Sequence, residues 1–168
     1  MILVAIGSNL SSRVGSPLAT GQAAVREMGA RGFSIRAIST WYETAPVPAS
    51  DQPWYVNGVV RVDSTLSPHA LLAVLHDIEH AYDRSRGMTN AARTLDLDLL
   101  AHGREVIGQG PLILPHPRLP ERAFVLYPLR DVAAQWQHPV SGQSPAQMIA
   151  CLAQTPENQG IRPISLGS

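Results

Sequence analysis

The sequence of 168 residues contains no lysine, because all 13 of its basic residues are arginine. This absence excludes a Walker A lysine, a Schiff-base lysine and a lysine general base. The 13 acidic residues balance the 13 arginines, so the net charge is zero. An overall positive charge that would attract nucleic acid or an anionic membrane is therefore absent. No apolar run approaches the length of a membrane span, and the first residues lack the features of a signal peptide. We therefore expect neither a nucleic-acid partner nor a membrane.

Cysteine is nearly absent as well. With Cys151 alone, the chain cannot form an internal disulfide, which is typical of cytoplasmic proteins. The apolar neighbours Met148, Ile149 and Leu152 predict that this thiol is buried and inert. An apolar fraction of 45% and a charged fraction of 15% are typical of a globular protein. We expect a single domain over residues 1–168, with a polar tail from about residue 154, acting as a monomer.

Hydrophobic patterns predict the order strand, helix, strand, strand, helix, strand. These elements cover residues 2–6, 16–29, 33–42, 54–63, 67–82 and 94–99. This is the order of a ferredoxin-like core. The expected fold class is therefore α/β (α+β), a single-domain three-layer sandwich with a largely antiparallel sheet.

Serine and proline mark the helix starts. A Ser-Pro pair opens both predicted helices, with serine as the cap and proline at the first helical position, and the pair Ser144-Pro145 predicts a further helix. Residues 43–53 should form a proline-rich loop and residues 103–113 a short hairpin. A last helix is expected over residues 121–132, interrupted at Pro128.

The segment TLDLDLL at residues 94–100 places leucine and polar residues in alternation. A period of two is typical of a strand with one buried face, so Asp96 and Asp98 should point the same way. Two residues of strand rise roughly 6.5–7 Å, so both carboxylates can approach one cation or a close pair. Three arginines just upstream can fork onto phosphate oxygens; they are Arg84, Arg86 and Arg93. Together these residues predict a site for magnesium and a polyphosphate.

Each of these features has an ordinary alternative. A D-x-D pattern on a strand is more often a solvated polar face than a metal site. His76 and His80 have the i, i+4 spacing of zinc ligands, but no third ligand is apparent, so we do not expect zinc. Taken alone, His116 is more typical of a residue that braces its loop, and Tyr55 and Phe124 are more typical of the core. Only the surrounding motifs favour a functional interpretation.

Four segments resemble landmarks of the 6-hydroxymethyl-7,8-dihydropterin pyrophosphokinase family of folate biosynthesis. They are AIGSNL at residues 5–10, residues 42–46 followed by DQPWYVN at 51–57, ARTLDLDLL at 92–100 and LPHPRLPERAFVLYPL at 114–129. Four motifs in the right order and spacing are far more specific than any one of them. The resemblance implies a ferredoxin-like core and the transfer of pyrophosphate from ATP to the hydroxymethyl group of the pterin, with release of AMP.

The resemblance also implies a nucleotide and metal site. Asp96 and Asp98 would hold two magnesium ions that bind the triphosphate of ATP, and the three upstream arginines would supply further positive charge. These five residues are the expected catalytic set. The residues expected around ATP are Glu79, Arg86, Arg93, Leu99, His116 and Arg122.

For the acceptor, the resemblance implies that the pterin stacks between Tyr55 and Phe124, while Asn57 contacts its polar edge. A flat heterocycle rich in donors and acceptors needs two apolar faces and a polar rim. Backbone groups complete this rim, from Thr44, Ala45 and Val47.

One loop departs from the family. Between Arg86 and Arg93, family members carry a longer loop with an arginine and a tryptophan that close over the substrates, whereas residues 87–92 read GMTNAA. Two other classes of function are therefore weighed against the enzyme. A non-catalytic pterin or nucleotide binding module would use the same pockets without turnover. A ferredoxin-like nucleic-acid binder would need a basic face, and the neutral net charge argues against it.

Overall fold

The computed structural model describes residues 1–46, 50–82, 94–153 and 160–166. Four predicted site residues lie outside these ranges: Val47, Arg84, Arg86 and Arg93. The loop at residues 87–92, which differs from the family pattern, also lies outside them.

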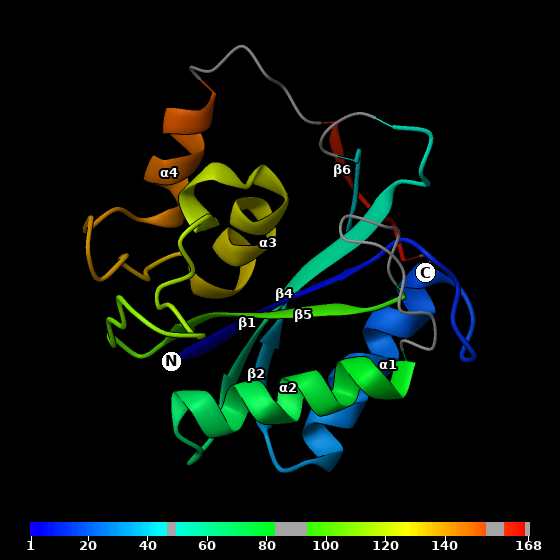
Figure 1. Cartoon of the computed structure of the whole chain (residues 1–168). Coiled ribbons are helices and arrows are strands. Elements are labelled where there is room, and N and C mark those ends of the chain that lie inside the picture. The colour runs from blue at the N-terminus through cyan, green and yellow to red at the C-terminus, as the bar shows by residue number, and fades with distance from the viewer. Residues whose placement is uncertain (47–49, 83–93, 154–159, 167–168) are drawn as a thin grey trace.

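A six-stranded sheet lies between two layers of helices, so the predicted three-layer α/β fold is confirmed (Figure 1). Helices α1 (Pro17–Ala30) and α2 (Pro68–Tyr82) cover one face, and α3 (Ala123–Ala133) and α4 (Pro145–Leu152) cover the other. The strands are β1 (Ile2–Ser8), β2 (Ser34–Ile38), β3 (Tyr42–Thr44), β4 (Tyr55–Asp63), β5 (Asp96–His102) and β6 (Ile161–Pro163). A short 3-10 helix at Leu119–Glu121 precedes α3. Among the described residues, no helix is long and apolar enough to cross a membrane.

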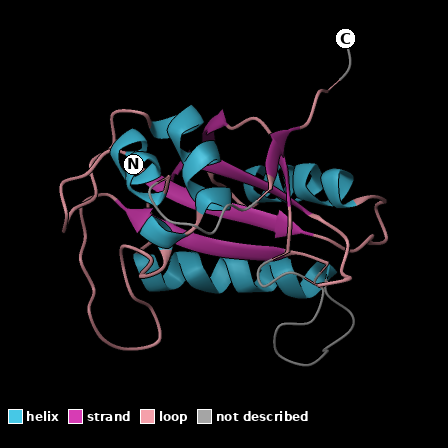
Figure 2. Ribbon diagram, turned by 90° about the horizontal axis from the view of Figure 1, so that it is seen from above, coloured by secondary structure: helices cyan, strands magenta, loops and turns pink. Residues whose placement is uncertain are grey.

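The strand order is β5-β1-β4-β3-β6, with β2 also paired to β4, and all of these pairings are antiparallel. Because β4 has nine residues, its outer edge accommodates β2 near Asp63 and β3 near Tyr55. The order β5-β1-β4-β2 is the ferredoxin-like arrangement expected from the sequence. Figure 2 shows the strands side by side from above. The last strand, β6, lies in the region predicted to be a polar tail.

The three Ser-Pro pairs begin helices as predicted. Ser16 accepts a hydrogen bond from the backbone N–H of Ala19 at 3.2 Å, and Ser144 forms a reciprocal capping box with Gln147. The Ser67 hydroxyl accepts from the backbone N–H of Ala70 at 3.3 Å at the start of α2. In each case proline occupies a position whose N–H has no helical partner.

The predicted strand over residues 33–42 is wrong as a single element. It forms β2 and the start of β3, separated by residues 39–41. The hydroxyl of Ser39 accepts from the backbone N–H of Val59 at 2.9 Å, and the Trp41 ring fills the space beside Gly58. Side chains thus interrupt the ladder, and the predicted loop begins two residues later, because Glu43 and Thr44 belong to β3.

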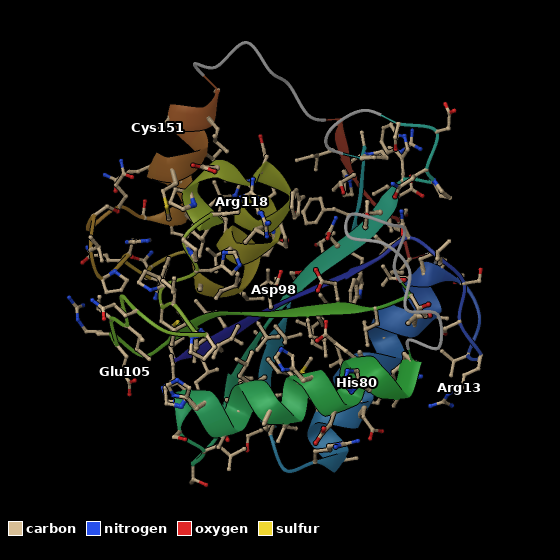
Figure 3. The ribbon with its side chains drawn as sticks, in the orientation of Figure 1. Arg13, His80, Asp98, Glu105, Arg118 and Cys151 are labelled. Atoms are coloured by element: carbon tan, nitrogen blue, oxygen red, sulfur yellow. The ribbon has the colours of Figure 1, made fainter. Side chains whose placement is uncertain are left out.

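Three further predictions are corrected. Among the described residues the hairpin at 103–113 is reduced to an isolated bridge between Ile107 and Leu114, in a segment where Pro111 has no N–H to donate. Pro128 does not interrupt α3, because its neighbours Val125, Leu126 and Leu129 are buried and hold the helix in place. Cys151 is exposed rather than buried. Helix α4 buries Pro145 and Met148, whereas Cys151 of the same helix is exposed to solvent (Figure 3).

The sheet separates two apolar cores, one against α1 and α2 and the other against α3 and α4. Leu97 and Leu99 of β5 are only 2% and 3% exposed and belong to the first core. Their polar neighbours Asp96 and Asp98 are half-buried on the opposite side, as the alternation predicted. The strand begins at Asp96, so Thr94 lies before it rather than within it. Figure 3 shows Asp98 on the side of β5 that faces α3.

A hydrogen bond between a buried tyrosine and a carboxylate joins β3 to α3. The Tyr42 hydroxyl donates to Oδ2 of Asp131 at 2.8 Å. Burial raises the pKa of Tyr42 to about 12, and the hydrogen bond and charge of Asp131 act in the same direction. A hydrogen bond to a charged group contributes about 1.5–3 kcal/mol.

Tyr42→Phe should therefore lower the free energy of unfolding by about 1.5–3 kcal/mol, because it leaves the carboxylate without this donor. Urea unfolding measures the change. Tyr127→Phe is the matched control: its ring lies 6.4 Å from that of Tyr42, but its hydroxyl has no hydrogen-bond partner among the described residues. Equal losses in both variants would contradict the assignment.

Candidate active site

Asp96 and Asn57 lie in one row across three neighbouring strands. In the register of the sheet, Gly7 of β1 pairs with Asn57 of β4 on one side and with Asp96 of β5 on the other. Neighbouring strands are about 4.8 Å apart, so the two polar residues are separated by roughly 10 Å. Directly paired residues project from the same face. The aspartate pair and Asn57 therefore share the face covered by α3.

Gly7 keeps the centre of this row open. A Cβ atom at this position would lie 2.9 Å from Oδ1 of Asn57, closer than such atoms normally approach. The Asn57 amide cannot easily move away, because its Nδ2 donates to Oγ1 of Thr44 at 2.6 Å and both residues are buried. Glycine inside a strand often marks a close approach of this kind.

Ser8 at the end of β1 and Asn9 just after it form hydrogen bonds to the segments that precede β5 and β4. The Ser8 hydroxyl donates to the backbone carbonyl of Thr94, just before the two aspartates. The Asn9 side chain donates to Oε1 of Gln52 at 3.1 Å and to the carbonyl of Pro53 at 3.3 Å, just before β4. One short segment therefore positions both the acidic strand and the strand that carries Asn57.

A cavity of about 390 Å³ opens between α2, β5 and the loop at residues 111–117. Strand β5 is at the edge of the sheet order, so its outer side borders this cavity. The walls combine polar and apolar side chains: Leu72, His76, Glu79, Asp96, Leu97, Asp98, Leu99, Pro111, Leu112, Ile113, His116 and Pro117. The loop is attached to β5 by a hydrogen bond from the His116 N–H to the Leu100 carbonyl, at 2.9 Å.

Three carboxyl groups crowd one end of the cavity. Burial raises the pKa of Glu79 to about 8, and the charge of Asp96, a hydrogen bond with Asp96 and the charge of Asp98 act in the same direction. The backbone N–H of Leu97 opposes the shift by donating to Oε2 of Glu79 at 3.1 Å. Like charges this close favour either a shared proton or a cation.

The donor set suits a cation that also takes ligands from a substrate. Within the described part of the chain, no group of three His, Cys, Asp or Glu side chains is arranged to hold a metal alone. Magnesium typically binds one or two protein carboxylates and fills its remaining positions with water and substrate phosphates. Asp96 and Asp98 fit that requirement, whereas zinc would need more protein ligands.

Arg122 connects the acidic end of the cavity to an aromatic side chain. Its Nη1 lies 3.7 Å from Oδ2 of Asp98, and its guanidinium carbon lies 5.5 Å from the ring centre of Phe124. The pair is partly exposed, so it contributes little to stability. Its guanidinium is instead available near the carboxylates to approach phosphate oxygens.

His116 is a neutral donor in this site. Burial lowers the pKa of His116, and the positive charge of Arg122 lowers it further. Its Nδ1 accepts from the backbone N–H of Arg118 at 3.2 Å, so the proton of the neutral ring is on Nε2. A neutral imidazole can donate Nε2–H to a phosphate oxygen without adding charge.

Comparison with known proteins identifies the family. The family model of 7,8-dihydro-6-hydroxymethylpterin-pyrophosphokinase matches residues 3–134. The chain belongs to this family. The protein named 2-amino-4-hydroxy-6-hydroxymethyldihydropteridine pyrophosphokinase of Pseudomonas aeruginosa is 37% identical over 150 residues, which cover 89% of this chain and 91% of the relative. The protein of the same name from Synechocystis sp. is 36% identical over 156 residues, covering 90% and 80%.

A third relative is much longer. The folic acid synthesis protein fol1 of Pneumocystis carinii is 37% identical over 143 residues, which cover 85% of this chain but only 19% of that protein. The chain thus spans about a fifth of the length of this fungal relative. Apart from Ile2 at the start of β1, the residues matched by the family model include every strand except β6.

The structure brings together most of the residues that the pterin pyrophosphokinase resemblance implied. Around the cavity it gathers Glu79, Asp96, Asp98, Leu99 and His116, with Arg122 beside Asp98. On the acceptor side, Asn57 and Thr44 are hydrogen-bonded, and Thr44 pairs with the half-buried Tyr55.

The sequence predictions missed the roles of Gly7, Ser8 and Asn9. In the sequence they stand out only as part of the AIGSNL segment at residues 5–10, which predicts no role for any one of them. A glycine near the end of an apolar strand can indicate a close approach of another group. Which residues lie beside Gly7, however, depends on the register in which β1 pairs with β4 and β5. Ala45, predicted to bind through its backbone, donates its N–H to the carbonyl of Gly160 at 2.9 Å.

Proposed function

We propose that this chain transfers pyrophosphate from ATP to the hydroxymethyl group of 6-hydroxymethyl-7,8-dihydropterin and releases AMP, as a step of folate biosynthesis. The observation that carries the proposal is the row Asp96, Gly7 and Asn57. In this row, a carboxylate suited to binding the magnesium of the triphosphate and an amide suited to binding a heterocycle lie on one face of the sheet. They are roughly 10 Å apart. That spacing leaves room for the hydroxymethyl group to meet the β-phosphate between them.

ATP would occupy the cavity beside β5. The apolar walls formed by Leu72, Leu99 and Leu112 suit a flat base, and the acidic end receives the triphosphate. Asp96 and Asp98 would hold two magnesium ions, whose bound charge offsets that of the phosphates during the displacement. Arg122 and the Nε2–H of His116 would contact phosphate oxygens directly. The arginines at 84, 86 and 93 are proposed to add positive charge that stabilises the triphosphate.

The pterin would lie under α3, between the rings of Tyr55 and Phe124. Tyr55 is two residues before Asn57 and thus projects from the same face of β4. The Asn57 amide, kept in orientation by Thr44, would pair with donors and acceptors of the pterin edge. Backbone groups at residues 44, 45 and 47 would complete the rim.

We propose a cytoplasmic monomer as the working form. One chain supplies both groups of described site residues, so a partner subunit is not needed to complete the site. The single cysteine, which is exposed, suits a reducing compartment.

The direct test incubates the protein with ATP, magnesium and the dihydropterin and separates the nucleotides. We expect AMP in amounts equal to the pyrophosphorylated pterin, and no AMP when the pterin or magnesium is omitted. Release of ADP would show ordinary kinase chemistry and overturn the proposal. Tight binding of both substrates without AMP would support the binding module instead.

A further inference from the structure

The last strand, β6, joins the sheet beside the proposed pterin site but lies beyond the residues matched by the family model. It pairs with β3 from Ile161 opposite Thr44 to Pro163 opposite Tyr42. Two backbone hydrogen bonds extend this pairing: Ala45 N–H to the Gly160 carbonyl at 2.9 Å, and Ile164 N–H to the Trp41 carbonyl at 2.7 Å. The whole of β3 is therefore held between β4 and β6 (Figure 1).

Arg162 of β6 contacts two residues that are adjacent in sequence to the proposed pterin rim. Its Nε lies 2.7 Å from Oε2 of Glu43, next to Thr44 in β3. Its guanidinium carbon lies 4.8 Å from the ring centre of Trp54, the residue before Tyr55. Thr44 and Tyr55 are directly paired across β3 and β4. The Arg162 side chain therefore connects the residues that precede each of them.

Trp54 is also in close contact with the start of β6. A Cβ atom on Gly160 would lie 2.9 Å from Cη2 of Trp54, so the indole ring packs directly against the backbone there. The ring thus contacts both Gly160 and the guanidinium of Arg162. Both contacts restrain the chain that enters β4 at Tyr55.

We propose that Arg162 is a positioning residue for the acceptor site, acting through Glu43 and Trp54 on the rim formed by Thr44, Ala45 and Tyr55. This inference rests on the proposed function. Because β6 and β5 are at opposite edges of the sheet, the effect is confined to the pterin and does not extend to ATP. The contacts are partly exposed, so their loss alters the site without unfolding the chain.

Steady-state kinetics with each substrate varied in turn tests this role. Arg162→Ala should raise the KM for the pterin about threefold to tenfold, as expected for the loss of one cation–π contact and one exposed ion pair, and leave the KM for ATP unchanged. Arg162→Lys keeps a cation near both partners and should restore most of the lost affinity. Trp54→Leu, which spares the ion pair with Glu43, should shift the pterin KM in the same direction by a smaller factor.

Arg36→Ala is the matched control. Arg36 forms a comparably exposed pair with Asp63, at 2.6 Å, between β2 and the far end of β4. It should leave both KM values unchanged. An unshifted pterin KM in Arg162→Ala, or equal shifts for pterin and ATP, would overturn the positioning role while leaving the proposed function in place. No AMP from the unmodified chain would overturn both.

Discussion

Replacing Asp98 by asparagine should reduce AMP release on the order of a hundred- to thousandfold, because a metal-binding carboxylate contributes several kcal/mol of charge stabilisation in the transition state. Asn keeps the size of the side chain and one oxygen, so the loss reports charge rather than packing. The fold should be preserved, since Asp98 is 32% exposed and lies 3.7 Å from Arg122, a distance at which a partly exposed ion pair contributes little to stability.

The same substitution relieves crowding among the carboxyl groups. The charge of Asp98 contributes to the raised pKa of Glu79, so its removal should not destabilise the apo protein. Thermal unfolding is expected to change little, while the magnesium concentration needed for residual activity rises. Asp63→Asn is the control, because Asp63 is also a strand carboxylate paired with an arginine, but at the opposite end of β4. Full activity in Asp98→Asn would rule out the proposed metal ligands.

Local patterns in the sequence were sufficient for much of this site. The alternation at residues 94–100 predicted correctly which side chains of β5 face the core, because the period of two is a property of the strand alone. Likewise, each Ser-Pro pair predicted a helix start, since the cap acts on residues only three positions away.

Features that depend on pairing between distant segments were not predictable in the same way. The row through Gly7 exists only because β1 pairs with β4 and β5 in a particular register. Strands β3 and β6 have three residues each, too few for a period to emerge, and they are held by pairing with each other. Pro128 was expected to break α3, but burial of the surrounding helix outweighed its local cost.

Gly7→Ala should be the most damaging single-methyl change on the acceptor side. The new Cβ would meet Oδ1 of Asn57 at 2.9 Å, and the amide can withdraw only by giving up its 2.6 Å hydrogen bond to Thr44. We expect the KM for the pterin to rise on the order of ten- to a hundredfold, as for the loss of one or two well-placed hydrogen bonds. The KM for ATP should stay within about twofold, because the atoms that the added methyl would meet within 4 Å belong to Asn57 and not to Asp96, the cavity residue paired with Gly7.

A double-mutant cycle separates this mechanism from a general loss of strand stability. Among the described residues, and apart from Gly7 and its two chain neighbours, Asn57 supplies the only atoms within 4 Å of the new methyl, so in an Asn57→Ala background the methyl enters open space. Gly7→Ala should then add little to the effect of Asn57→Ala, and the two changes should be strongly non-additive. Gly29→Ala in α1 is the matched control, because its methyl would meet only Ile35, at 4.0 Å. Additive effects would mean that Gly7 acts on the strand and not through the Asn57 amide, and the row across β5, β1 and β4 would then lose its role in orienting the acceptor.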